Sequence, residues 1–200
     1  MPFENFECMQ DFIFYLKLGW EHIISLDALD HQLFVLVLVA AYSYSEWRKI
    51  LILVTAFTIG HSVTLALSTL DIIRIPSDWV EFLIPLTILI TAFDNILMRN
   101  QPKNLMQLNY YLALIFGLIH GMGFANTARM TLAQEQNIFT PLLGFNIGLE
   151  LGQVVVVTLI LLIEFLLIKF FKLKKVYWMV FASFITLLIS WKICIERRPF

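Results

Sequence analysis

The chain has 200 residues, of which 60% are hydrophobic and 14% are charged, and its net charge is −1. Soluble domains are about 45–50% apolar, so this composition, with a mean hydropathy of +0.80, excludes an ordinary soluble protein and predicts an integral membrane protein. The near-neutral charge gives no indication of a nucleic-acid partner. The two cysteines, Cys8 and Cys194, form no CxxC motif and no disulfide framework.

The N-terminal stretch has no basic region and no small-residue cleavage site, so we expect no removable signal peptide. Residues 11–26 are mostly apolar, but they are fewer than the roughly 20 residues that span a bilayer. Glu21 and His22 interrupt them further. We therefore predict a short re-entrant or interfacial helix here, with a short full span as the alternative.

Six longer apolar segments follow, and we predict that each spans the membrane as a helix. They cover residues 28–45, 50–70, 79–98, 106–125, 140–168 and 176–194. The predicted fold is an all-α polytopic membrane helix bundle, a single domain over residues 1–200. It has six full spans, or seven if residues 11–26 also cross.

The basic residues predict an orientation in the bilayer. Loops 46–49, 99–105 and 169–175 together hold eight Lys and Arg residues, against six on the opposite side. Because cytoplasmic loops carry an excess of Lys and Arg, we predict that these loops are cytoplasmic and that the C-terminus is outside the cytoplasm.

All four histidines of the chain lie within or beside predicted spans. Any one of them alone is explained equally well as a hydrogen-bonded packing residue, but four together beside carboxylates favour a functional cluster. Imidazole and carboxylate groups are typical ligands of Ni²⁺, Co²⁺ and Zn²⁺. We predict an intramembrane metal site formed by His22, Asp30, His31, His61 and His120. Its metal affinity should fall below about pH 6.5, as the imidazoles become protonated.

The spacing of the first two histidines predicts a bend. His22 and His31 are nine residues apart, so on one straight helix they would point in opposite directions. They can face one site only if the chain breaks near residues 25–29. Asp27 lies inside this break and is four residues from His31; we predict that it lines the route of the ion.

The segment 140–168 has a small-residue face and a polar face. The small-residue face is a ridge typical of helix packing, and it is also a predicted contact between two copies of the chain; it consists of Gly144, Gly148 and Gly152. An unpaired carboxylate at mid-membrane would not face lipid, so we predict that the polar face lines an aqueous or ion route. It consists of Asn146, Glu150 and Gln153.

Four stretches occur in a fixed order: HxxxxxxxDHxLF from His22, FTxGHSxTLAL from Phe57, FGLIHGMGFA from Phe116 and FNxGLELGQ from Phe145. Together they resemble the HupE/UreJ family of nickel and cobalt permeases, and most closely its second branch. The resemblance implies a small helical protein of the bacterial inner membrane that moves or binds Ni²⁺ or a related ion.

Three functions are compatible with these observations. The first, which we favour over an enzyme, is transport or binding of a divalent transition metal ion, Ni²⁺ or Co²⁺, through the predicted site. The second is an intramembrane zinc-dependent hydrolase of the ceramidase-like type, in which three histidines hold Zn²⁺ and Asp30 or Glu150 acts as the base. The third is an accessory membrane subunit whose polar cluster is structural.

Overall fold

The computed structural model describes residues 2–97, 106–124 and 138–199. This part of the chain is helical and contains no β-strand, which confirms the predicted all-α class. Its α-helices are α1 (Pro2–Ile24), α2 (Leu29–Ala40), α3 (Trp47–Thr69), α4 (Ser77–Leu97), α5 (Met106–Gly123), α7 (Phe139–Phe171) and α8 (Lys175–Glu196). Two short 3₁₀ turns, η1 (Leu26–Ala28) and η2 (Tyr44–Glu46), precede α2 and α3.

Four helical segments are long and apolar enough to cross a membrane, namely Tyr44–Thr69, Ser77–Leu97, Phe139–Phe171 and Lys175–Glu196. A fifth is added if α1 and α2, which are bent by 67° relative to each other, count as one broken span. The described residues therefore give four or five spans, and the predicted number of six is not confirmed. The boundaries of α3, α4, α7 and α8 nevertheless follow the predicted apolar segments closely.

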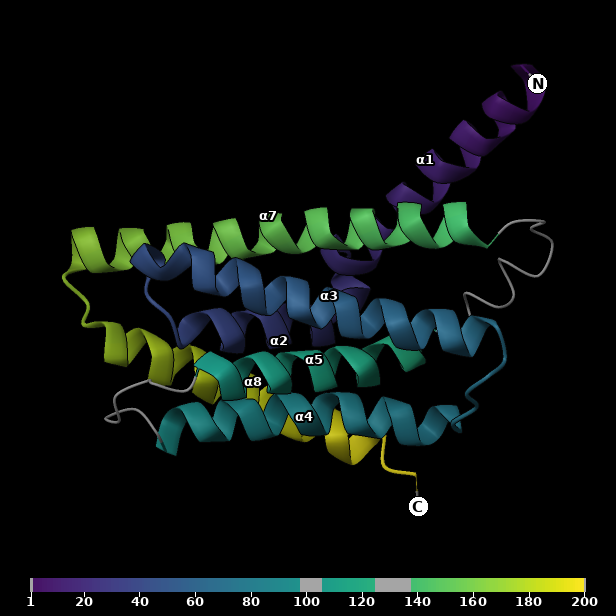
Figure 1. The fold of residues 1–200 in the computed structure, drawn as a ribbon. Helices are drawn as coiled ribbons and strands as arrows, with labels where there is room; N and C mark the ends of the chain where they lie inside the picture. The colour runs from purple at the N-terminus through teal and green to yellow at the C-terminus, as the bar shows by residue number, and fades with distance from the viewer. Residues whose placement is uncertain (1, 98–105, 125–137, 200) are drawn as a thin grey trace.

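The prediction that residues 28–45 form a complete span is wrong. Helix α2 has only 12 residues, so at 1.5 Å per residue it is about 18 Å long, well short of the roughly 30 Å hydrocarbon core. Helix α1 begins at the end of the bundle where α7 begins, and α2 leads to the opposite end, where α3 begins (Figure 1). The two helices therefore form either one broken span or a re-entrant pair, and α1 packs along α7.

The glycine ridge of α7 is a packing surface, and its partner is α1 of the same chain. A Cβ atom on Gly148 would lie 1.9 Å from the carbonyl oxygen of Leu16, and one on Gly144 would lie 2.7 Å from that of Phe12. Only glycine permits such an approach. The ridge is therefore already covered within one chain, and a contact between copies through it stays a prediction.

Helices α3 and α5 approach each other in the same way. A Cβ atom on Gly60 would lie 2.2 Å from the carbonyl oxygen of Leu114, and one on Gly117 would lie 2.1 Å from that of Phe57. The absence of a side chain at Gly117 therefore lets α5 lie directly against the backbone of α3.

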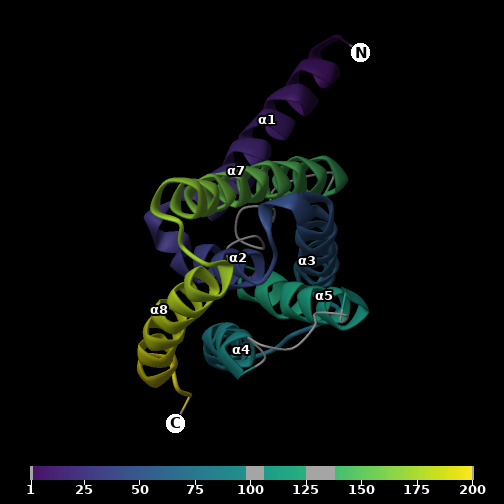
Figure 2. The same ribbon diagram turned by 90° about the vertical axis from the view of Figure 1, so that its left-hand side faces the viewer.

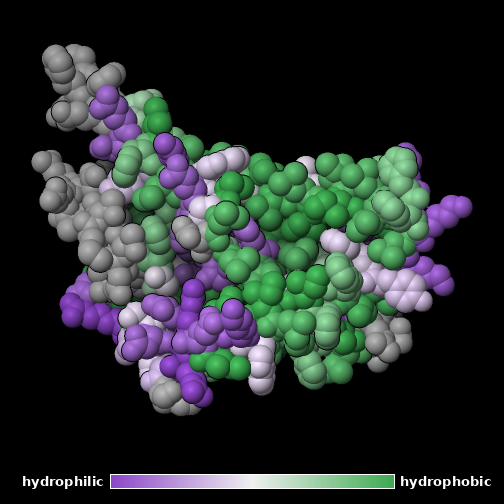
Figure 3. All heavy atoms as spheres, turned by 180° about the vertical axis from the view of Figure 1, so that it is seen from behind, coloured by the Kyte–Doolittle hydropathy of each residue, from purple (hydrophilic) through white to green (hydrophobic). Residues whose placement is uncertain are grey.

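Viewed along its length, the bundle has α2 at its centre and the other helices around it (Figure 2). The face in Figure 3 carries a broad apolar band with hydrophilic residues toward both ends, as expected for a membrane-embedded bundle. The turn from α2 to α3 and the turn from α7 to α8 lie at one end of the bundle, and the C-terminus lies toward the other (Figure 1). Which end is cytoplasmic stays a prediction.

A buried ion pair joins the last two helices. Glu164 of α7 is fully buried, and its Oε2 lies 2.7 Å from Nζ of Lys175 at the start of α8. Lys175 also donates a hydrogen bond to the backbone carbonyl of Tyr42, which follows α2. One ammonium group therefore ties together the ends of three helices.

Candidate metal centre

The histidines of four different helices converge in the interior of the bundle. His22 of α1, His31 of α2 and His61 of α3 place one ring nitrogen each within 4.8 Å of the others. The ring of His120 in α5 lies 5.0 Å from that of His31, measured between centroids. Sequence reasoning named all four residues, and the structure brings all four together.

Five ring nitrogens of this cluster lack hydrogen-bond partners. The Nε2 atoms of His22, His31 and His120, and both ring nitrogens of His61, are buried without one. Buried polar atoms without partners are rare in folded proteins because each costs free energy. Three of these rings, those of His22, His31 and His61, can each offer one nitrogen within 4.8 Å of the others, which is an arrangement that a bound metal ion would satisfy.

Two of the imidazoles are held in orientation by hydrogen bonds at Nδ1, the ring nitrogen on the side away from the cluster. Nδ1 of His31 lies 3.0 Å from Oδ1 of Asp30, and Nδ1 of His120 lies 2.8 Å from the carbonyl oxygen of Phe116. Because both partners are acceptors, the proton sits on Nδ1 and the lone pair of Nε2 points toward the cluster, as in many metal sites. Asp30, a predicted ligand, therefore contacts Nδ1 of His31 on the side away from the cluster. Its Oδ2 is 3.7 Å from Nη1 of Arg197.

The predicted break between His22 and His31 is confirmed. Helix α1 ends at Ile24, and Ser25 has an extended backbone with ψ of 154°, after which η1 turns the chain into α2. Gln32 stabilises this break, because its side-chain amide lies 2.9–3.3 Å from the backbone carbonyls of Ile23, Ile24 and Ser25. An amide has two N–H groups, so it can satisfy two of these carbonyls at a time.

Sequence reasoning missed Gln32. The available signal was an amide side chain one residue after His31, inside an apolar segment, where an unpartnered polar group would be costly.

Aromatic rings surround the imidazoles. The ring of His61 stacks on that of Phe145 at 6.1 Å, and the ring of His22 lies 4.5 Å from that of Phe124. The ring of Phe57 lies 5.1 Å from that of His120. Apolar surroundings of this kind influence the properties of a bound ion and limit how a ligand enters the site.

A cavity of about 190 Å³ opens onto the cluster. We refer to it as the histidine cavity. Three of the histidines line it, and three charged residues stand around them; these six residues are His22, His31, His120, Asp30, Glu81 and Arg197. The cavity provides an approach to the imidazoles from the end of the bundle that holds the C-terminus.

The residues predicted to line a route on α7 have other partners. Both carboxylate oxygens of Glu150 accept hydrogen bonds from the hydroxyls of Thr55 and Thr58, and Oε1 of Gln153 lies 2.8 Å from the same Thr58 hydroxyl. Asn146 donates to the backbone of its own helix. These three residues line neither the histidine cavity nor the other large cavity of the described bundle. The side chain of Asp27 lies outside the described residues.

The fold and the site define a helical membrane protein with a buried histidine centre. The model of the family described as HupE / UreJ protein matches residues 3–197. The chain therefore belongs to this family, which indicates a membrane protein concerned with nickel or cobalt transport. No curated protein and no solved structure matches the chain.

Proposed function

We propose that this protein carries a divalent transition metal ion, Ni²⁺ or Co²⁺, across the membrane, and that the ion binds transiently to the four histidines. The observation that carries the proposal is the convergence of His22, His31 and His61, which place one nitrogen each within 4.8 Å of the others, on imidazoles whose buried nitrogens lack hydrogen-bond partners. The ligands would be Nε2 of His22, His31 and His120 and one ring nitrogen of His61.

The composition of the site favours these ions over the abundant hard cations. Mg²⁺ and Ca²⁺ take oxygen ligands, whereas neutral imidazole suits Ni²⁺, Co²⁺ and Zn²⁺. The site also supplies no thiolate, because the only cysteine among the residues with described side chains, Cys194, lies outside both large cavities. Neutral ligands bind a divalent ion less strongly than charged ones, which suits a site that must release its ion.

The hydrolase alternative has less support. It requires a carboxylate that is free to act as the base beside the metal. Asp30 is engaged with His31 and Arg197, and Glu150 with two threonine hydroxyls. Neither carboxylate is therefore available next to the imidazole nitrogens in this conformation.

Metal binding and uptake test the proposal. Purified protein is equilibrated with Ni²⁺ or Co²⁺ and its metal content measured, and the protein is then reconstituted into liposomes for uptake. We expect His31→Ala and His61→Ala to lose both binding and uptake. Ser190→Ala is the control, because it removes a buried hydroxyl of α8 that makes no hydrogen bond.

Two outcomes would reject the proposal. Uptake that survives both histidine substitutions would show that the cluster is not on the route. Histidine variants with lower folded yield but unchanged metal selectivity would instead support an accessory subunit with a structural cluster.

A further inference from the structure

A second cavity, of about 200 Å³, lies between α2, α4 and α5. One part of its lining is apolar, but five side chains supply oxygen or nitrogen atoms: Tyr42, Thr91, Asp94, Asn95 and Asn109. The proposed metal centre uses none of these residues.

The two cavities are stacked along the same three helices. On α5, His120 lines the histidine cavity and Asn109 lines the second cavity; eleven residues of helix separate them by about 16 Å. On α4, Glu81 lines the histidine cavity and Asp94 the second cavity. Likewise, His31 of α2 lines the first, and Tyr42, which follows α2, lines the second. The second cavity therefore lies beyond the metal centre, toward the opposite end of the bundle.

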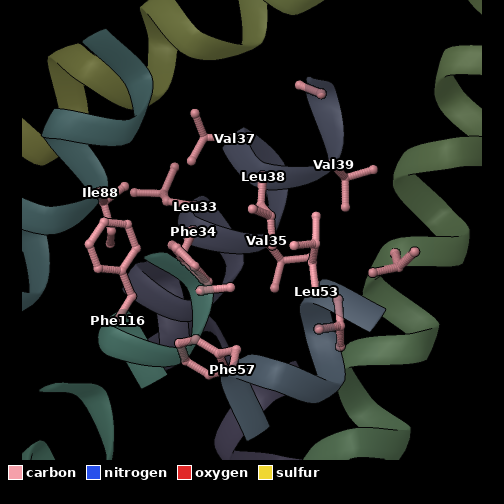
Figure 4. Packing of buried hydrophobic residues seen from close by; sticks show 14 of the residues in the cluster. Leu33, Phe34, Val35, Val37, Leu38, Val39, Leu53, Phe57, Ile88 and Phe116 are labelled. Carbon is pink, nitrogen blue, oxygen red and sulfur yellow. The ribbon is translucent and has the colours of Figure 1, made fainter. Parts of the chain in front are cut away.

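A layer of aromatic side chains separates the two cavities. The ring of Phe34 stacks on that of Phe57 at 4.9 Å and meets that of Phe116 edge-on at 5.5 Å. Figure 4 shows these three rings together, with Ile88 of α4 beside Phe116. All four side chains are at least nine-tenths buried, so this layer is packed inside the bundle.

Phe116 belongs to both sides of this layer. Its backbone carbonyl accepts the hydrogen bond from His120, while the residue itself lines the second cavity. The ring of Phe34 lies 5.6 Å from that of His120. Both rings therefore lie at the boundary between the imidazoles and the second cavity.

We propose that the second cavity is the other half of the ion route and that Phe34, Phe57 and Phe116 form the seal between the halves. This inference rests on the proposed transport function and gives it a path along α2, α4 and α5, in place of the predicted path along α7. An apolar constriction blocks hydrated ions. The oxygen atoms of Asp94 and Asn109 offer polar partners to a partly hydrated divalent ion that has left the imidazoles.

Thiol labelling in sealed proteoliposomes tests the seal without any transport measurement. The background carries Cys8→Ser and Cys194→Ser, and a charged, membrane-impermeant thiol reagent is added to one face at a time. The probes are Ser25→Cys in the histidine cavity and Thr91→Cys in the second cavity. We expect each probe to react from one face only, and the two faces to be opposite.

The decisive variant is Phe116→Ala. In this variant we expect Thr91→Cys to lose its protection and to react from both faces. Tyr111→Ala is the matched control, because it removes an exposed ring from the same helix and should leave the protection intact. If Phe116→Ala does not fold, Phe116→Leu keeps the helix packed and removes only the ring.

The inference fails if Thr91→Cys reacts from the same face as Ser25→Cys, from both faces before any phenylalanine is changed, or from neither. It also fails if a folded Phe116 variant keeps the protection. Failure of the transport proposal has a different signature, namely no metal binding or uptake by the unmodified protein, because the labelling requires no metal.

Discussion

Asp30 shows how a neighbouring carboxylate prepares an imidazole for a metal ion. Its Oδ1 lies 3.0 Å from Nδ1 of His31 and also accepts the backbone N–H of that residue. The sequence identified Asp30 because it adjoins His31, but adjacency does not say whether a carboxylate meets the metal or the ring. The helical backbone decides this, because it turns the carboxylate toward Nδ1 and leaves Nε2 facing the other histidines.

Replacing Asp30 with Asn should therefore weaken metal binding without abolishing it. The amide is a poorer acceptor, so the tautomer and the ring orientation of His31 are held less firmly, and we expect a loss of about 10–100-fold in affinity. Titration of the purified protein with Ni²⁺ measures this. Asp78→Asn, at an exposed position at the start of α4, is the control, and equal affinity in both variants would contradict the assigned role.

The break between α1 and α2 is the element on which the metal centre depends. Without it, His22 would point away from His31. The amide of Gln32 lies within hydrogen-bond distance of the backbone carbonyls at the broken end of α1. We expect Gln32→Leu to cost about 1–3 kcal/mol of stability, because buried acceptors lose their donor.

A double-mutant cycle tests the link between this break and the metal centre. If Gln32 positions His22, then His22→Ala should reduce metal affinity in the parent but have little further effect in Gln32→Leu. Groups that act through one another show such non-additivity. Independent, additive losses would show that the break holds without Gln32.

The contact between α3 and α5 makes a second prediction at the level of elements. Gly117→Ala would place a methyl group 2.1 Å from a backbone carbonyl of α3, so the two helices must separate, at a cost of about 1–3 kcal/mol. Gly123→Ala is the control for thermal unfolding, because its nearest neighbour is the end of the Ile84 side chain, which can move aside. Similar unfolding temperatures for the two variants would contradict this account.

For the molecule as a whole, the sequence predicted the helix bundle, most helix boundaries and the four histidines of the centre. Hydropathy was sufficient to predict the helices, and the free-energy cost of burying ionisable groups was sufficient to single out the histidines. The residues that contact each helix face were not predictable. Periodicity shows that one side of α7 is polar, but it does not show that threonines of α3 bind Glu150 on that side. The ion route proposed along α2, α4 and α5 was not predictable from the sequence either. Its seal consists of phenylalanines, and in a sequence these cannot be told apart from other core residues.

The ion pair between α7 and α8 makes a prediction about overall stability. Lys175→Met leaves the carboxylate of Glu164 buried without its partner, and we expect a loss of about 3 kcal/mol. The double variant Glu164→Leu with Lys175→Met should recover most of this, because an apolar pair of similar size replaces both charges. Thermal unfolding in detergent measures both, and a double variant no more stable than Lys175→Met would contradict the explanation.

The glycine contacts divide the metal centre between two tightly joined helix pairs. His22 belongs to α1, which is joined to α7, whereas His61 and His120 belong to α3 and α5, which are joined to each other. A displacement of one pair relative to the other would break the hydrogen bonds from Thr55 and Thr58 of α3 to Glu150 of α7, and it would withdraw His22 from His61 and His120. If the centre binds an ion as proposed, occupancy should therefore depend on the spacing of the two pairs. Zn²⁺ should shorten the distance between spin labels on the lipid-facing sides of α3 and α7, and an unchanged distance would exclude this coupling.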